Sequence, residues 1–94
     1  MLESKFKTEV KEELTRMFPG CYIFKQDDFQ GIPDMLILWE DHWAMLEFKR
    51  VTQASKQPNQ MFYISEFNDM SFAAFIFPEN KREVLRALQR SFKS

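Results

Sequence analysis

The chain has 94 residues, 45% of them hydrophobic, with 13 basic and 14 acidic side chains and a formal net charge of −1. A chain of this length forms one small domain, and its near-neutral charge excludes a general attraction to nucleic acid, so any such contact needs a local basic patch or bound metal ions. No apolar run approaches the length of a membrane span, and the N-terminus lacks a signal segment. The one cysteine, Cys21, excludes an internal disulfide and fits a reducing compartment. We therefore expect a cytoplasmic protein.

The N-terminal segment has the pattern of an amphipathic helix. Ser4 can cap this helix, and Pro19-Gly20 ends it. Its apolar positions recur at helical spacing: Phe6, Val10, Leu14 and Met17. Residues 21–24 then read as a strand, and residues 27–33 form a polar loop.

Two apolar strands over 34–39 and 43–49 flank a polar turn and predict a hairpin. Charged residues interrupt them where apolar ones are expected: Asp34 at the start of the first strand, and Glu47 and Lys49 at the end of the second. An isolated buried charge is costly, so these groups call for a partner, and a bound divalent cation is one. The alternative interpretation is a turn aspartate beside a solvated Glu47–Lys49 pair.

The length of the hairpin loop decides whether Asp34 and Glu47 share a face. Side chains alternate faces along a strand, so a two- or four-residue loop puts both carboxylates on the same face. A regular three-residue loop separates them unless a bulge corrects the register. A shared site therefore predicts an even-numbered loop or a bulge.

The rest of the chain continues the α/β pattern. Residues 51–58 read as an exposed connection, and a second helix follows Pro58 with Met61, Ile64 and Phe67 facing inward. Residues 71–77 are apolar on both faces, as in a strand covered on both sides. A last helix carries Val84, Leu85 and Leu88. The order α-β-β-β-α-β-α, with a right-handed parallel crossover through residues 43–77, predicts a mixed four-stranded sheet flanked by helices.

Three motifs in this order resemble those of a nuclease family. They are Gly31-Ile32-Pro33-Asp34, Glu47-Phe48-Lys49 and Gln57-Pro58-Asn59-Gln60. Together they are similar to the PD-(D/E)XK nuclease superfamily, and within it to the virus-type replication-repair nuclease (VRR-Nuc) branch, whose minimal members are phage proteins of about this size. The resemblance spans nearly the whole chain. It implies a single VRR-Nuc-like nuclease domain over residues 1–94 with a restriction-endonuclease-like core.

The resemblance also implies roles for individual residues. Asp34 and Glu47 would ligate Mg²⁺ or Mn²⁺, with the backbone carbonyl of Phe48 as a further oxygen ligand. Lys49 would orient the attacking water and offset negative charge on the phosphate. Gln60 would lie on the second helix near Lys49, although it also reads as an exposed polar residue. Glu9 is expected to support the site from the first helix.

Glu12 and Glu13 are the other acidic candidates on this helix, and Glu13 shares a helix face with Glu9. A solvated helix face is the alternative interpretation of all three residues. Scattered lysines and one arginine either form a positive patch around the site or serve solubility. These residues are Lys5, Lys7, Lys11, Lys25, Arg50 and Lys56.

These observations predict a metal-dependent endonuclease that hydrolyses DNA, with branched DNA such as Holliday junctions as the preferred substrate. The alternatives are a catalytically silent nucleic-acid-binding or assembly module, and an enzyme that cuts RNA. The small core and the 11 phenylalanines favour a homodimer. Its candidate interface residues are Trp39, Trp43, Phe62 and Phe67.

Overall fold

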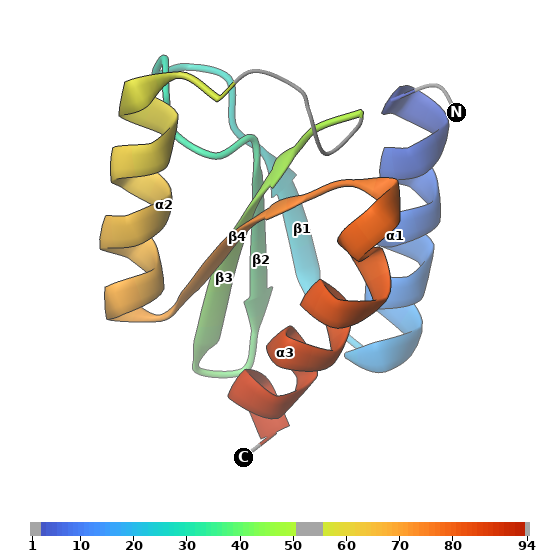
Figure 1. The fold of residues 1–94 in the computed structure, drawn as a ribbon. Coiled ribbons are helices and arrows are strands. Elements are labelled where there is room, and N and C mark those ends of the chain that lie inside the picture. The colour runs from blue at the N-terminus through green and yellow to red at the C-terminus, as the bar shows by residue number, and fades with distance from the viewer. Residues whose placement is uncertain (1–2, 51–55, 94) are drawn as a thin grey trace.

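The computed structural model describes residues 3–50 and 56–93, so residues 51–55 of the expected connection lie outside the described residues. In these two described ranges, three helices, four strands and a short 3-10 helix follow one another (Figure 1). They are α1 (Glu3–Met17), β1 (Tyr22–Lys25), β2 (Met35–Trp39), β3 (His42–Phe48), α2 (Pro58–Met70), β4 (Phe72–Ile76), η1 (Pro78–Asn80) and α3 (Lys81–Lys93). None of the helices in this described part of the chain is both long and apolar enough to cross a lipid bilayer.

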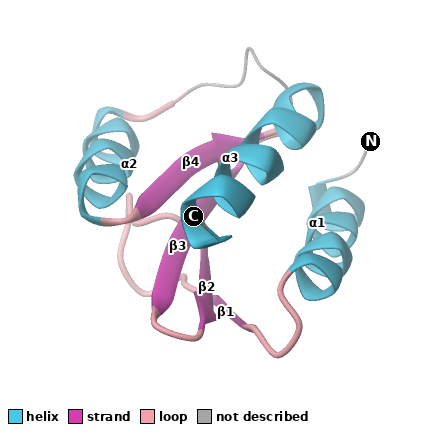
Figure 2. Ribbon diagram, turned by 90° about the horizontal axis from the view of Figure 1, so that it is seen from below, coloured by secondary structure: helices cyan, strands magenta, loops and turns pink. Residues whose placement is uncertain are grey.

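The four strands form one mixed sheet in the order β1-β2-β3-β4. The first two pairings are antiparallel, and β3 pairs with β4 in parallel, because α2 carries the chain back along the sheet. Figure 2 shows α1 and α3 on one side of the sheet and α2 on the other. The predicted α/β architecture, a mixed four-stranded sheet flanked by helices, is confirmed.

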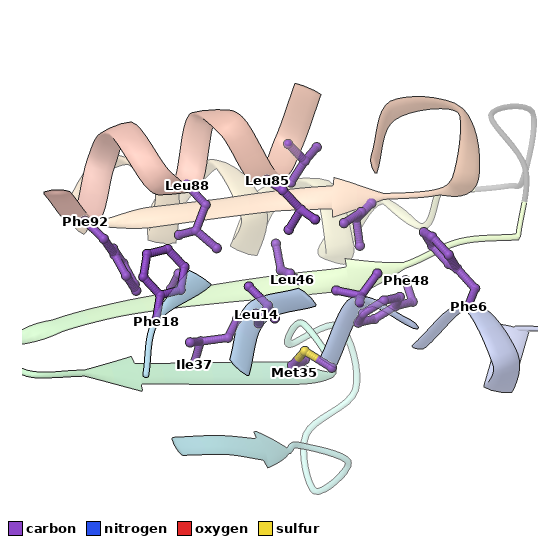
Figure 3. Close-up of a cluster of buried hydrophobic side chains, with 14 residues drawn as sticks. Phe6, Leu14, Phe18, Met35, Ile37, Leu46, Phe48, Leu85, Leu88 and Phe92 are labelled. Carbon is purple, nitrogen blue, oxygen red and sulfur yellow. The ribbon is translucent and has the colours of Figure 1, made fainter. Parts of the chain in front are cut away.

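The main core lies between the sheet and the pair α1–α3, and alternate residues of each strand supply it. On β3, Ala44, Leu46 and Phe48 are buried and pack in one cluster with residues of α1 and α3. Phe18, directly after α1, and Phe92 of α3 belong to this cluster (Figure 3). The rings of Phe18 and Phe92 lie 5.0 Å apart, centroid to centroid. Because side chains alternate, the residues between them, Glu47 among them, point to the α2 side of the sheet.

The hairpin uses the two-residue loop Glu40-Asp41, since Trp39 pairs with His42. Glu40 takes a left-handed backbone conformation with a φ of 57°, which such tight loops require. The register continues through Leu36–Met45 and Met35–Leu46, so Asp34 lies opposite Glu47 on the α2 side of the sheet. The expectation of an even-numbered loop is confirmed.

The rotation of α2 about its axis differs from the expected one. Met61 was expected to face inward but is 54% exposed, so that prediction is wrong, whereas Ile64 and Phe67 are half-buried. Gln60, one residue before Met61, points to the sheet and hydrogen-bonds to Glu47 and Lys49. Neighbouring helical residues are about 100° apart around the axis, so the inward position of Gln60 turns Met61 toward solvent.

Candidate functional site

The charged residues of the hairpin gather at the end of the sheet where β1 and β3 end and β2 begins, at the top in Figure 1. Pro33 is fully buried there and fixes the chain just before Asp34. Gly31 has a φ of +92°, and a Cβ atom at this position would lie 2.5 Å from the side chain of Asn59 in the first turn of α2. The Gly-Ile-Pro-Asp loop is therefore held directly against the helix that carries Gln60.

Glu47 is a buried carboxylate, with only 8% of the residue exposed. Its pKa is raised from 4.5 to about 7, first by burial and then by the negative charge of Asp34. The charges of Lys49 and Lys7 and a hydrogen bond from the Asp34 backbone act in the opposite direction. Two facing carboxylates in partial burial thus repel each other, and bound positive charge would relieve this repulsion.

Gln60 connects Glu47 to Lys49. The Lys49 ammonium donates a hydrogen bond to Gln60 Oε1 over 2.9 Å, and Gln60 Nε2 donates to Glu47 Oε2 over 3.2 Å. The same Oε1 accepts the backbone N–H of Gln57 at 3.1 Å, which anchors the amide at the start of α2. One amide therefore sets the positions of both the carboxylate and the ammonium group.

Lys7 of α1 reaches the site from the other side of the sheet. Its Nζ lies 3.2 Å from Asp34 Oδ2 and 5.5 Å from the centroid of the Phe48 ring. From the sequence, Lys7 was only one of six residues in a possible positive patch. No sequence signal singles it out, because its spacing from Lys11 puts both lysines on one helix face but does not show that this face meets Asp34.

The structure does not bring Glu9 or Glu13 to this pair of carboxylates. Among the described residues, no cluster of three or more His, Cys, Asp or Glu side chains could hold a metal ion. Glu13 is directed to α3, where it pairs with Lys81 at 2.5 Å and with Arg82 at 3.6 Å. Glu9 is one turn from Glu13 on the same helix face, whereas Lys7 is on the side that faces Asp34.

Two carboxylates remain, and their oxygens are of the donor type that a divalent cation prefers. Asp34 and Glu47 supply two hard oxygen donors on one face, and the repulsion between them favours a cation. Phe48 can offer only its backbone carbonyl as an oxygen ligand, because its side chain contains no oxygen. Waters complete the coordination of Mg²⁺ in sites with few protein ligands.

The basic residues do not form one patch. Lys7, Lys11 and Lys25 line a common pocket beside Asp34, whereas the Lys56 ammonium lies over the ring of Phe75 at 5.3 Å. Lys5 and Arg50 are exposed, and neither lines this pocket.

Comparison of the chain with protein-family models, with curated proteins and with solved structures found no match. The chemistry of the site must therefore be inferred from the residues that the fold brings together.

Proposed function

We propose that this protein is a Mg²⁺- or Mn²⁺-dependent endonuclease that hydrolyses phosphodiester bonds of DNA, with the restriction-endonuclease-like core of VRR-Nuc domains. One observation carries the proposal: Asp34, Glu47 and Lys49 lie at the same end of the sheet, and Gln60 joins Glu47 to Lys49. A buried carboxylate with a pKa near 7, beside a second carboxylate and an ammonium group, is the kind of perturbed cluster that marks functional sites.

Each residue has a part in the proposed reaction. Asp34 and Glu47, with the Phe48 carbonyl, would hold the metal ion. When bound, that ion supplies Lewis-acid polarisation of the phosphate and a water of lowered pKa. Lys49, held by Gln60, orients the attacking water and stabilises the negative charge that develops on the phosphate. The water gives up a proton as its oxygen bonds to phosphorus, one ester P–O bond breaks, and the departing oxygen takes up a proton.

Branched DNA, including Holliday junctions, is the proposed substrate, and a homodimer is the proposed active form. A two-fold dimer presents the same site twice, so paired cuts in a branched substrate follow from its symmetry. Recognition of DNA shape suits a site that presents lysines for phosphate contacts.

The first test is cleavage of four-way junctions, flaps, single strands and linear duplex by the purified protein with Mn²⁺. We expect cleavage by the parent protein and none by Asp34→Ala or Glu47→Ala, with the circular dichroism spectrum of the fold retained. Glu66→Gln, an exposed residue on α2, is a matched control and should cut normally. Undiminished cleavage by Asp34→Ala would remove the basis of the proposal.

Metal titration separates this enzyme from a silent binding module with the same fold. A ligand that binds only the folded state raises the melting temperature, so millimolar Mg²⁺ or Mn²⁺ should stabilise the parent protein but not Asp34→Ala. Equal melting temperatures with and without metal, together with no cleavage of any DNA, would favour the silent module.

A further inference from the structure

Within the described residues, half of the α2 side of the sheet is left open. α2 packs chiefly against β3 and β4. On β1, Tyr22 is 67% exposed and Phe24 is 49% exposed. They pair with Leu38 and Leu36 of β2 and so lie on the same side of the sheet as Asp34 and Glu47. Large aromatic side chains on an uncovered sheet face indicate a binding surface.

The two aromatic rings lie next to the candidate active site. The Tyr22 and Phe24 rings are nearly parallel, at 7° with centroids 6.3 Å apart. The backbone N–H of Gln26 donates to the Asp34 carbonyl over 2.9 Å, which extends the β1–β2 pairing to Asp34. Phe24 is two residues before Gln26 on the same face, so it is a diagonal neighbour of Asp34.

A cationic pocket adjoins these rings at the edge of the sheet. It has a volume of about 490 Å³, and Phe24 and Asp34 line it together with Lys7, Lys11 and Lys25. Three ammonium groups against one carboxylate make the pocket attractive to an anion. Lys25 has a side chain that is 74% exposed and is 3.7 Å from the equally open Asp27, so this pairing is readily exchanged for a phosphate.

We propose that this surface binds an unpaired strand of nucleic acid, whose bases stack on Tyr22 and Phe24 while its phosphates contact Lys11 and Lys25. The strand must be unpaired, because duplex bases have their faces covered by their neighbours, whereas single-stranded bases can stack on aromatic side chains. The three lysines favour a polyanion over a second copy of this chain, which carries the same charges. The inference rests on the proposed nuclease function and narrows its branched substrates to those with a single-stranded segment, such as flaps, because a four-way junction is fully paired.

The test is the binding of a fluorescein-labelled single-stranded oligonucleotide and of a blunt duplex of the same sequence. Fluorescence anisotropy is measured with the full chain in EDTA, where no hydrolysis takes place. We expect tighter binding of the single strand, and about a tenfold or greater loss of affinity in Tyr22→Leu/Phe24→Leu. Leucine keeps the strand apolar and removes only the aromatic ring.

Separate variants test the contribution of the lysines and the specificity of the proposed surface. Lys11→Ala/Lys25→Ala should weaken binding and reduce its dependence on salt concentration, because fewer counterions are released. Met70→Ala, which shortens a 67% exposed apolar residue at the C-terminal end of α2, and Lys5→Ala, outside the pocket, should bind like the parent protein. Unchanged binding by Tyr22→Leu/Phe24→Leu, or an equal loss in Met70→Ala, would overturn the proposal.

Two further outcomes separate strand binding at this surface from a dimer interface and from nuclease activity. If Tyr22→Leu/Phe24→Leu dissociates a dimer in light scattering and leaves oligonucleotide binding unchanged, the surface is an interface between copies and the proposal is wrong. If single-strand binding depends on Tyr22 and Phe24 but no DNA is cut under any metal condition, the binding surface stands and the nuclease function fails.

Discussion

Glu47 is the residue in which burial and charge conflict most directly. In the folded protein its pKa is about 7, whereas the ordinary value is 4.5. The folded state therefore holds this proton more tightly than the unfolded state, so the contribution of Glu47 to stability falls as the pH rises from 4.5 to about 7. Above that range the cost of ionised Glu47 is fully present, at most about 3 kcal/mol.

Glu47→Gln removes this cost. In metal-free protein we expect the variant and the parent to differ little in unfolding free energy near pH 4.5, and the variant to become more stable by up to about 3 kcal/mol by about pH 8. Urea denaturation across this range measures the difference, with Glu66→Gln as the exposed control. A difference in unfolding free energy that does not change with pH would contradict the raised pKa of Glu47.

Gln60 acts through its neighbours, as a positioning residue. Gln60→Ala removes the hydrogen bonds to Glu47 and Lys49 and should lower cleavage roughly 10- to 100-fold, the usual cost of losing a group that orients metal ligands. Gln89→Ala, at an exposed position on α3, is the control.

Gln60→Glu separates this positioning role from a merely structural one. The variant keeps the acceptor for Lys49 but places a negative charge against Glu47, which raises the Glu47 pKa further. The pH profile of cleavage should therefore shift to higher pH. An unshifted profile would indicate that Gln60 only supports the fold of α2.

At the scale of the elements, the contact between the loop at 27–33 and α2 determines whether Gln60 of α2 reaches the charged residues of the hairpin. Gly31→Ala combines a left-handed φ with a 2.5 Å approach to Asn59, whereas Gly20→Ala has only the left-handed φ, with nothing within 4 Å among the described residues. We expect Gly20→Ala to cost about 1–2 kcal/mol in unfolding free energy and Gly31→Ala to cost more. Adding Asn59→Ala should recover most of the excess, because only the Asn59 Cβ, at 3.2 Å, then remains close. Equal costs for the two glycines would contradict a tight loop–helix contact.

The sequence predicts the elements and the hairpin well because their signals are local. The polar turn between two apolar runs predicts the hairpin but leaves its loop length open. A shared site for Asp34 and Glu47 predicts an even-numbered loop or a bulge, and the structure has a two-residue loop that puts Asp34 opposite Glu47. The rotation of α2 was not predictable from apolar spacing, because α2 orients by the polar contacts of Gln60 rather than by a buried stripe. The proximity of Lys7 to Asp34 also lies beyond the sequence, since it depends on how α1 crosses the sheet edge.

For the whole molecule, the burial of the aromatic residues reduces the number of candidates for the dimer interface. The Trp39 ring packs against the Phe18 ring, with 5.1 Å between the ring centroids, and the indole N–H donates a hydrogen bond to the Pro19 carbonyl. The Trp43 and Phe67 rings pack edge to face, with 6.2 Å between their centroids. Of the four candidate interface aromatics, only Phe62 is largely exposed, on the outer face of α2.

We expect light scattering at micromolar concentration to give twice the chain mass of 11.4 kDa, and Phe62→Asp to reduce it to the monomer. An 11.4 kDa particle that stays unchanged on adding junction DNA would rule out the dimer.

The way α2 is attached has a consequence for how the protein loses its site. Within residues 58–70, all of them described, no residue of α2 is fully buried, whereas α1, α3 and the sheet share a continuous core. The helix can therefore open locally at a smaller free-energy cost than global unfolding, and its amide protons should exchange with solvent before those of β3. Gln60 leaves the sheet whenever α2 opens. On heating, the arrangement of Glu47 and Lys49 is lost before the fold is.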